Sequence, residues 1–400
     1  MNILFISHNG LTEPLGQSQV LAYLEALVPL GHRFELITFE PNRGSAHLPP
    51  LKREGIEHHP VFRTPGSSLR SKMRDLVNGL VVGQSILSQA GIDIIHARSL
   101  LPAALADALR SRQKRHIPLV FDLPGFLPQE FLDAAHWTKN DLRYQSARAA
   151  QNILIARSQG IAVGTGPALE MIRQRLMPSR SIPPVEIVPS CVDTDRFRPD
   201  PKARALTRKR FAVGTAPLLV YAGSLGSWYL HEEMVLFFAA VRQIRRDAKF
   251  LVVTRSDARP LLEFAEGLKV KESVFVVQAE PKDMPALLAG ADMGLCLVAP
   301  APSKRASSPV KMAEYLACGL PILVNAGVGD MEHHAGHCPA VRLLPDFSAE
   351  SLALAAQSLP RLLTEETRQE ARLYALENFH LKKVGAERYH RLYRRALGSR

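Results

Sequence analysis

Short apolar runs rich in Val, Ile and Leu alternate with helix-period segments along almost the whole chain, and this alternation constrains the fold most. The first unit is the clearest: residues 3–7 have the pattern of a buried strand, a glycine-containing loop follows, and a helix is expected over 17–30, ended by Gly31. Further strands are expected at 34–38, 92–96, 119–122, 160–163 and 186–188. Strands and helices in alternation predict an α/β fold with a doubly wound parallel sheet.

The pattern then begins again after a proline-punctuated linker at 197–201. Strands are expected at 218–222, 250–254, 273–277, 294–298 and 321–325. We therefore expect two Rossmann-like domains, an N-terminal one over 1–192 and a C-terminal one over 193–378. A basic helix at 379–400 is expected to pack back on the N-terminal domain. Ligands of such sheets bind at the carboxyl ends of the strands, here in a central cleft that the two domains face.

Composition narrows the class of protein. The chain has 400 residues, of which 46% are hydrophobic and 22% charged, so extensive disorder is excluded. Its four cysteines are widely separated and form no CxxC pair, which argues against a disulfide framework, a thiolate zinc site or a redox dithiol. The first residues lack the features of a signal peptide, and no apolar run is long enough to span a bilayer. We expect a soluble, cytoplasmic protein.

The formal net charge of +12 favours phosphorylated ligands or an anionic membrane surface as partners. Nucleic acid is not expected, because no nucleic-acid-binding motif accompanies the charge. Two segments combine basic and apolar residues: the C-terminal helix, and residues 69–87 in the N-terminal domain. Each has two interpretations, a helix packed on its own domain or one that lies on a membrane surface. The protein could thus be peripheral on the inner face of the membrane.

The segment 307–321 carries the clearest candidate site. Ser308 is a good N-cap and Pro309 suits the first position of a helix, whose N-terminus attracts anions. Lys311 in the first turn adds a positive charge, and Glu314 on the same face can accept hydrogen bonds from a diol such as a ribose. This pattern fits a nucleoside diphosphate. The alternative is a surface ion pair on a well-capped helix.

The chain resembles the GT-B glycosyltransferases of the GT4 family (glycosyltransferase group 1). Residues 311–321 are similar to the family's donor-binding helix and the turn that follows it. Residues 186–199, EIVPSCVDTDRFRP, resemble the family signature IPNGVD…F.P at the entrance to the second domain, and residues 4–19 resemble its first strand and glycine loop. The resemblance covers nearly the whole chain. It implies a retaining transfer of a sugar from a nucleotide diphosphate donor.

The resemblance also implies roles for individual residues. Lys311 would face the phosphates, and Glu314 matches the second Glu of the family's E-x7-E pair, which holds the ribose hydroxyls. The N-terminal domain contributes Asp122, which falls where some members place a polar residue near the reacting centre, or which simply caps a turn. The implied donor-binding set is Gly16, Gln17, Gly223, Ser224, Arg255, Ser308, Lys311 and Glu314, and the implied catalytic set is Asp122, Lys311 and Glu314.

Three departures from the family pattern concern charge. Ala306 stands where the first Glu of the pair belongs, and Ser224 stands where many members have an Arg. The residues 228–231, WYLH, offer no Lys. Since the departing diphosphate must be neutralised, a cation from elsewhere would have to replace these residues. The candidates are Lys304, Arg305 and Arg255.

Two patterns suggest a metal and are better explained otherwise. His333, His334 and His337 have ligand-like spacing, but we expect them in a solvated loop. The DTD sequence at 193–195 resembles a DxD motif but lies inside the linker signature. No metal and no cofactor is therefore expected, because in GT-B enzymes, as the resemblance implies, cationic side chains and helix dipoles take the place of a metal.

The expected function is therefore a retaining, hexosyltransferase-type glycosyltransferase of the GT4 kind. Its partners would be a nucleotide-sugar donor and a hydroxyl acceptor from a glycolipid, lipid-linked oligosaccharide or polysaccharide pathway. Two alternatives stay open from the sequence. One is a non-catalytic nucleotide-sugar-binding or scaffold protein, which the missing charges suggest. The other is a sugar-nucleotide epimerase or hydrolase, because related two-domain folds catalyse those reactions.

Overall fold

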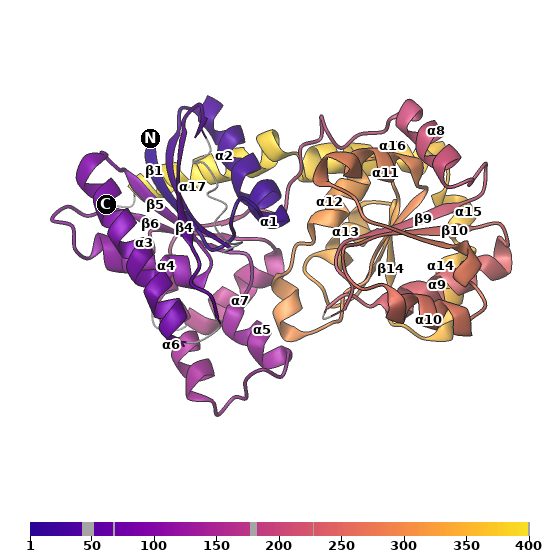
Figure 1. Ribbon diagram of the computed structural model, residues 1–400, viewed down its shortest axis with the longest axis horizontal. Helices are drawn as coiled ribbons and strands as arrows, with labels where there is room; N and C mark the ends of the chain where they lie inside the picture. The colour runs from indigo at the N-terminus through magenta and orange to yellow at the C-terminus, as the bar shows by residue number, and fades with distance from the viewer. Residues whose placement is uncertain (42–51, 67–68, 177–181, 227, 399–400) are drawn as a thin grey trace. The chain divides into compact units, whose positions relative to one another are not determined.

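The computed structural model describes residues 1–41, 52–66, 69–176, 182–226 and 228–398 (Figure 1). The chain divides into two compact units. The first comprises Met1–Pro189 together with Leu381–Arg400, and the second comprises Ser190–His380. The division thus falls at 189/190 and 380/381, where the sequence suggested 192/193 and 378/379.

The first unit contains an eight-stranded sheet in the order β3-β4-β2-β1-β5-β6-β7-β8. All pairings are parallel except that of β3 with β4. The strands are β1 (Asn2–Ser7), β2 (Arg33–Glu40), β3 (Lys52–Arg53), β4 (Ile56–Phe62), β5 (Ile94–Arg98), β6 (Leu119–Leu123), β7 (Gly160–Val163) and β8 (Val185–Ile187). Central strands such as β6 are buried along their whole length, as expected when helices cover both faces of a parallel sheet.

The helices of the first unit follow the expected alternation. They are α1 (Pro14–Gly16), η1 (Gln17–Leu21), α2 (Ala22–Leu27), η2 (Val28–Leu30), α3 (Leu69–Gln89), α4 (Leu100–Arg110), α5 (Leu127–Asp133), α6 (Leu142–Arg157) and α7 (Gly166–Leu176). The single helix expected over 17–30 is a run of four short helical segments that begins three residues earlier, at Pro14. Gly31 ends it in the left-handed conformation, with φ of 83°.

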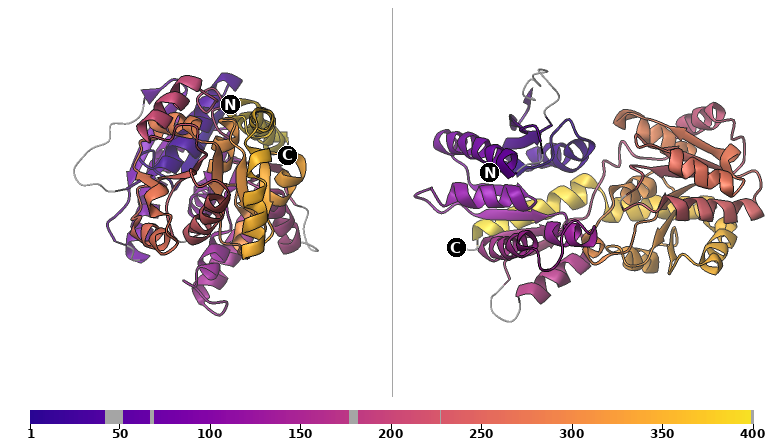
Figure 2. Two further views of the ribbon diagram at one scale, coloured as in Figure 1. Left: turned by 90° about the vertical axis from the view of Figure 1, so that its right-hand side faces the viewer. Right: turned by 60° about the horizontal axis from the view of Figure 1, so that its bottom comes forward.

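The C-terminal segment, η6 (Leu381–Ala386) and α17 (Glu387–Gly398), belongs to the first unit. Helix α17 packs against β6, β7 and β8, and Figure 2 shows it in yellow beside the strands of this unit. Its buried face consists of Tyr389, Leu392, Tyr393 and Ala396. The apolar face expected for this helix is therefore a packing face.

The second unit contains a six-stranded parallel sheet in the order β11-β10-β9-β12-β13-β14. Its strands are β9 (Leu218–Ala222), β10 (Lys249–Val253), β11 (Val274–Val277), β12 (Met293–Cys296), β13 (Ile322–Asn325) and β14 (Val341–Leu344). Its helical segments are α8 (Pro201–Arg210), α9 (His231–Ile244), α10 (Arg259–Gly267), η3 (Lys271–Ser273), η4 (Pro281–Asp283), α11 (Met284–Gly290), η5 (Pro302–Ala306), α12 (Val310–Ala317), α13 (Met331–His337), α14 (Ala349–Gln357), α15 (Leu359–Leu362) and α16 (Glu365–Asn378). The helices cover both faces of the sheet, and a separate apolar core lies on each face.

Candidate functional site

Helix α12 forms the centre of the candidate site, and the structure corrects how it begins. Ser308 is not its N-cap: the helix starts at Val310, after Pro309, and no side chain caps it. The Ser308 hydroxyl instead accepts a hydrogen bond from the Ser190 N–H at 3.0 Å, and its carbonyl accepts one from the Ser190 hydroxyl at 2.6 Å. The Ser308 side chain is thus hydrogen-bonded to Ser190, which lies far away in the sequence. The helix N-terminus keeps N–H groups without intrahelical partners.

The position of α12 relative to β9 is set by one tyrosine. The hydroxyl oxygen of Tyr315 accepts a hydrogen bond from the N–H of Ala222, the last residue of β9, at 2.8 Å. The Tyr315 ring fits only because Gly294 on β12 has no side chain: a Cβ there would lie 2.2 Å from the ring. This contact fixes α12 beside the carboxyl end of β9.

Gly223, the first residue of that loop, is held in a conformation that favours glycine, with φ of 144°. A Cβ at this position would lie 3.0 Å from Nζ of Lys311 and 3.2 Å from the hydroxyl of Tyr221. The structure therefore brings together two residues that the sequence suggested for donor binding, Gly223 and Lys311, at the carboxyl end of β9. This edge of the sheet is where ligands of such folds bind.

Lys311 is a buried cation held by aromatic rings. Its side chain is 7% exposed, and its Nζ lies 3.2 Å from the centre of the Tyr229 ring and 4.7 Å from that of Tyr221. It also donates a long hydrogen bond, 3.4 Å, to the Tyr221 hydroxyl. Burial lowers the pKa of Lys311 to about 8. Among the residues that the structure describes, no carboxylate lies within ion-pair distance of Lys311, so its charge stays uncompensated.

Glu314 lies one turn further along α12 and is half-buried. Burial raises its pKa to about 7, although Lys311 and Arg196 act in the opposite direction. A carboxylate in this position can accept hydrogen bonds from two neighbouring hydroxyls. Lys311 and Glu314 thus form a cationic and an acidic position on one helix, without the surface ion pair that was the alternative interpretation.

A second lysine comes to the same loop, and sequence reasoning missed how it is held. Trp228 follows the glycine loop, and Nζ of Lys304, on η5, lies 4.0 Å from the centre of its ring. The sequence suggests Lys304 only as a replacement charge, and the segment WYLH offers no Lys. The signal was present, since two adjacent aromatic residues directly after a glycine loop can each hold a cation.

The remaining candidates of the second unit have other surroundings. The side chain of Arg255, which follows β10, is half-exposed and forms an ion pair with the exposed Glu280 at 2.9 Å. Ser224 is exposed, and its carbonyl accepts a hydrogen bond from the Tyr221 hydroxyl. Ala306, where the family has a Glu, is fully buried.

Gly16 and Gln17 lie in the first unit, where the structure gives each a local role. A Cβ on Gly16 would lie 1.9 Å from the carbonyl oxygen of Gly10, so the fold of the loop itself requires glycine here. The side-chain amide of Gln17 donates a hydrogen bond to the Leu11 carbonyl at 2.5 Å. Both residues therefore shape the loop between β1 and the first helix.

Asp122 is a buried carboxylate with a full set of partners. It is 3% exposed at the end of β6, where Arg98 forms an ion pair with it and the Tyr389 hydroxyl donates a hydrogen bond at 2.9 Å. Burial opposes ionisation, but Arg98, the nearby His96 and the hydrogen bond from Tyr389 together lower the pKa of Asp122 to about 2. The carboxylate stays ionised and bound by protein groups, so this geometry fits a positioning residue better than a proton acceptor or a simple turn cap.

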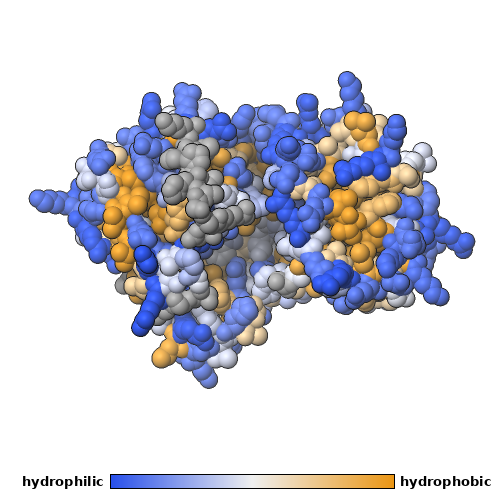
Figure 3. Space-filling model, in the orientation of Figure 1, coloured by the Kyte–Doolittle hydropathy of each residue, from blue (hydrophilic) through white to orange (hydrophobic). Residues whose placement is uncertain are grey.

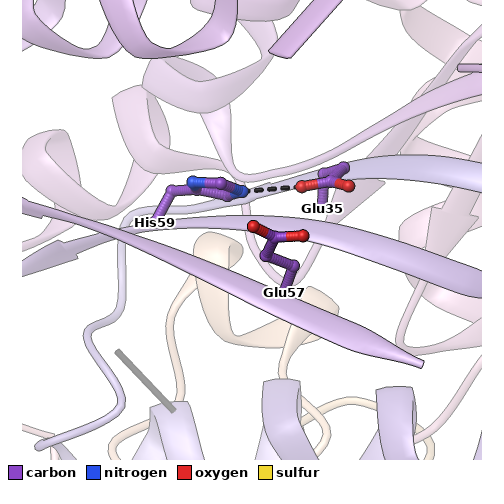
Figure 4. Close-up of side chains that lie close together, drawn as sticks. All are labelled: Glu35, Glu57 and His59. Atoms are coloured by element: carbon purple, nitrogen blue, oxygen red, sulfur yellow. Dashed lines mark hydrogen bonds and ion pairs between the residues drawn. The ribbon is translucent and has the colours of Figure 1, made fainter. Parts of the chain in front are cut away.

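Three side chains of the first unit have their ligand atoms within 4.8 Å of one another: Glu35 on β2, and Glu57 and His59 on β4 (Figure 4). His59 Nε2 lies 2.6 Å from a Glu35 oxygen. This contact accounts for the closeness of His59 and Glu35. They lie on neighbouring strands of the first unit, and none of the motifs discussed above includes them.

The three histidines expected in a solvated loop lie on helix α13 instead, so that expectation was wrong. The His334 ring is turned inward, lies 2.9 Å from the Tyr374 hydroxyl and has a pKa lowered by burial to about 4. The rings of His333 and His337 lie 4.1 Å apart on the exposed face. The i, i+4 spacing of these two therefore comes from a helical turn. In the DTD sequence, Asp193 accepts backbone hydrogen bonds from Asp195 and Arg196, which makes it part of a turn.

Solved structures with the same fold define the class of protein. Sucrose-phosphate synthase from Thermosynechococcus elongatus matches with a TM-score of 0.78 at 15% identity and covers 100% of both chains. HepE of Anabaena, solved with UDP and glucose, matches with a TM-score of 0.70 at 16% identity over 98% of this chain and 99% of its own. The two Rossmann-like domains are those of a GT-B fold.

Sequence comparison identifies the family. The family profile described as Glycosyltransferase Family 4 matches residues 16–196, and that described as Glycosyl transferases group 1 matches residues 216–361. The chain belongs to the GT4 (group 1) glycosyltransferases. A relative from Mycolicibacterium smegmatis, a GDP-mannose-dependent alpha-(1-6)-phosphatidylinositol monomannoside mannosyltransferase, is 30% identical over 158 residues. That match covers 37% of this chain and spans only 40% of the relative's length.

Proposed function

We propose that the protein transfers a sugar from a nucleoside diphosphate sugar to a hydroxyl group of its acceptor, with retention of anomeric configuration. One observation carries the proposal: the buried, uncompensated ammonium of Lys311 beside Gly223, at the carboxyl edge of a Rossmann-like sheet. A buried cation without a carboxylate destabilises the protein unless an anion binds to it. A diphosphate supplies that anion.

In this proposal different residues of α12 bind different parts of the donor. Lys311 and the N–H groups at the helix N-terminus would stabilise the charge that develops on the departing diphosphate. Glu314 would accept hydrogen bonds from the ribose hydroxyls and so orient the nucleoside. In this proposal Asp122 touches no substrate and holds Arg98 and Tyr389 in place. The chain's own cations take the place of a metal ion, and no cofactor takes part.

Transfer assays with a matched pair of variants test the proposal. The protein is incubated with GDP-mannose, UDP-glucose or ADP-glucose and a set of lipid-linked and carbohydrate acceptors, and NMR of the product gives the anomeric configuration. Glu314→Ala should lose donor binding by calorimetry, whereas Glu266→Ala, which removes an exposed carboxylate of α10, should not. Donor binding without transfer to any acceptor would support a non-catalytic binder. Conversion of the donor alone would support an epimerase or hydrolase.

We also propose that the acceptor is presented at an anionic membrane surface, with the protein peripheral to it. Helix α3 exposes Met73, Val77 and Val81, which are 53%, 51% and 66% exposed, and basic residues are exposed on its first turns. In Figure 3 hydrophobic surface lies over the region that α3 occupies in Figure 1. Charge complementarity favours anionic lipid. Among the described residues no helix is both long enough and apolar enough to cross a bilayer.

Vesicle sedimentation tests the membrane proposal. The protein should sediment with phosphatidylglycerol vesicles and not with phosphatidylcholine vesicles, and the Val77→Ser/Val81→Ser double variant should bind more weakly. Leu354→Ser on α14 removes an equally exposed apolar side chain from the second unit and serves as the control. Equal sedimentation of both variants would contradict a role for α3.

A further inference from the structure

A cavity of about 510 Å³ lies along helix α6 of the first unit, and none of the motifs discussed above includes it (Figure 1). Its volume falls within the range of about 300–1,000 Å³ that is typical of small-molecule sites. The residues on α6 that line it recur one turn apart, so they share one face of the helix. Six of the described residues line the cavity: Lys139, in the turn before α6, and Tyr144, Gln145, Arg148, Ala149 and Asn152.

The cavity is basic, and the protein does not neutralise its charges. Lys139 and Arg148 are both exposed, and neither forms an ion pair or a side-chain hydrogen bond with any residue that the structure describes. The nearest carboxylate in the sequence, that of Asp141, accepts a hydrogen bond from the Thr138 N–H at 2.7 Å and forms an ion pair with Arg143. Two cations of the cavity are therefore available to an anion.

Arg175 on α7 adds to this positive charge. Its guanidinium lies 4.2 Å from the centre of the Phe126 ring and donates a hydrogen bond to the side-chain oxygen of Gln151 at 3.1 Å. Both of these partners are neutral. Burial and the charge of nearby Arg148 lower the pKa of Arg175. The two arginines thus repel each other, and an anion bound at Arg148 would relieve that repulsion.

Two side chains of the cavity have polar groups that are left without hydrogen bonds. Tyr144 is only 6% exposed, and its hydroxyl forms no hydrogen bond within the described part of the chain. The Oδ1 atom of Asn152 is buried and also has no partner there. Buried polar groups are normally hydrogen-bonded, so a ligand that supplies the missing bonds gains free energy. An amide oxygen accepts from a hydroxyl, and a tyrosine hydroxyl can donate to one or accept from one.

We propose that this cavity binds a phosphate group with hydroxyls beside it, the chemistry of a sugar phosphate and of a hydroxylated phospholipid headgroup. Arg148 and Lys139 bind the phosphate, since a planar guanidinium fits two phosphate oxygens. Tyr144 and Asn152 bind the neighbouring hydroxyls. The site lies in the first unit and shares no residue with α12, so this inference does not rest on the proposed function.

Calorimetry of the full chain with glucose 6-phosphate, glucose and inorganic phosphate tests the soluble form of this ligand. Arg148→Met should weaken binding of glucose 6-phosphate by about ten- to a hundredfold, as for loss of a hydrogen bond between charged groups. Arg143→Met removes the same charge from α6 outside the cavity and should leave the affinity unchanged. Tyr144→Phe should weaken binding of glucose 6-phosphate by about two- to tenfold and leave that of inorganic phosphate unchanged.

Sedimentation with phosphatidylglycerol vesicles distinguishes the two sources of the ligand. If the headgroup fills the cavity, Arg148→Met should sediment less than Arg143→Met, and glucose 6-phosphate should release the wild type from the vesicles. If the ligand is a soluble sugar phosphate, the two variants should sediment equally while calorimetry still separates them. Thermal unfolding shows that each variant is folded. Folded Arg148→Met and Arg143→Met proteins that behave alike in both assays would overturn the proposal.

Lys311→Met separates this inference from the proposed function. Because Lys311 belongs to the second unit, this variant should lose nucleotide binding and still bind glucose 6-phosphate as the wild type does. Glucose 6-phosphate binding that is lost in Lys311→Met and kept in Arg148→Met would place the ligand at α12 and contradict the site on α6. Wild-type protein that binds glucose 6-phosphate through Arg148 but binds none of GDP, UDP and ADP would overturn the proposed function alone.

Discussion

Asp122, near the end of β6 in the first unit, and Lys311, on α12 beside the end of β9 in the second, are both buried charges, yet their surroundings differ. Asp122 is paired with Arg98 and accepts a hydrogen bond from Tyr389. Lys311 rests on Tyr221 and Tyr229 with no carboxylate in ion-pair distance among the described residues. The pKa values reflect this difference. The pKa of Asp122 is lowered to about 2, which favours its charged form, whereas the pKa of Lys311 is lowered to about 8, which disfavours its charged form.

The difference separates a structural charge from a binding charge. A buried carboxylate with a cation and hydrogen-bond donors around it stabilises the fold that surrounds it, here the contact between β6 and the C-terminal helix. A buried cation with only rings around it lowers the stability of the unliganded protein and gains that free energy back when an anion binds. The family resemblance of the sequence placed both residues in the same implied catalytic set.

Removing the paired charge should have the largest effect. Asp122→Ala leaves Arg98 buried without its carboxylate, which should lower the free energy of unfolding by about 3–5 kcal/mol. Chemical denaturation measures this change. Asp257→Ala, which breaks an exposed pair with Arg259, should have little effect and is the control. A folded Asp122→Ala protein of wild-type stability that fails to transfer sugar would show that Asp122 is catalytic after all.

Removing the uncompensated charge of Lys311 should raise the free energy of unfolding instead of lowering it. Lys311→Met keeps most of the side-chain volume and its contact with the rings, so it should raise the free energy of unfolding by about 3 kcal/mol at neutral pH, which corresponds to the lowered pKa. The folded-state pKa of about 8 lies below the ordinary value of 10.5. Wild-type stability should therefore rise towards that of the variant as the pH increases from 8 to 10.5. If Lys311→Met lowered the free energy of unfolding, the Lys311 charge would stabilise the fold as the Asp122 charge does, and the predicted difference between the two sites would be contradicted.

Tyr389 sharpens the comparison, because it belongs to the paired site and lies on the C-terminal helix. Tyr389→Phe removes the hydroxyl that donates to Asp122 while the ion pair with Arg98 remains. The free energy of unfolding should fall by about 1–2 kcal/mol, the range for a hydrogen bond to a charged group. Tyr374→Phe, whose hydroxyl contacts the neutral His334, should cost about 1 kcal/mol or less. Equal losses would mean that the charge of Asp122 adds nothing.

The smallest predicted effect is a pH profile of nucleotide affinity. Above pH 8 the unliganded Lys311 loses its proton, so diphosphate affinity should fall by up to about tenfold per pH unit. Below pH 7 Glu314 becomes protonated and accepts the ribose hydroxyls less well, so affinity should fall on that side too. Calorimetry across this range should give a maximum between pH 7 and 8. Glu314→Gln should remove the acidic limb and keep the alkaline one.

Much of the fold could be predicted because it depends on local patterns. The buried strand at 218–222 coincides with β9, and the other four strands predicted in the second unit lie within two residues of their observed ends, because each is a short apolar run. Strand β14 was not predicted. Strand β4 was missed because His58, His59 and Pro60 interrupt its apolar pattern. Helix α13 was missed because the glycines before it suggested a loop that continues past them.

The candidate site was less predictable, because long-range contacts set it. Sequence placed Lys311 and Glu314 on one helix, but it could not show that Ser308 bonds to Ser190 or that Asp122 bonds to Tyr389, 267 positions later. Propensity favours Ser308 as an N-cap, and a tertiary hydrogen bond overrides it. The sequence could not show the aromatic contacts of the lysines, because they depend on the loop after β9 pairing with the segment after β12.

Calorimetric titration of the wild type and Lys311→Met with GDP, UDP and ADP tests the central claim most directly. The account predicts that the wild type binds at least one of them and that Lys311→Met binds it at least about a hundredfold more weakly while unfolding at a higher temperature. The combination matters, because a merely damaged fold would lose both affinity and stability. A Lys311→Met protein that binds the nucleotide as tightly as the wild type would contradict the assignment of this buried lysine to the diphosphate.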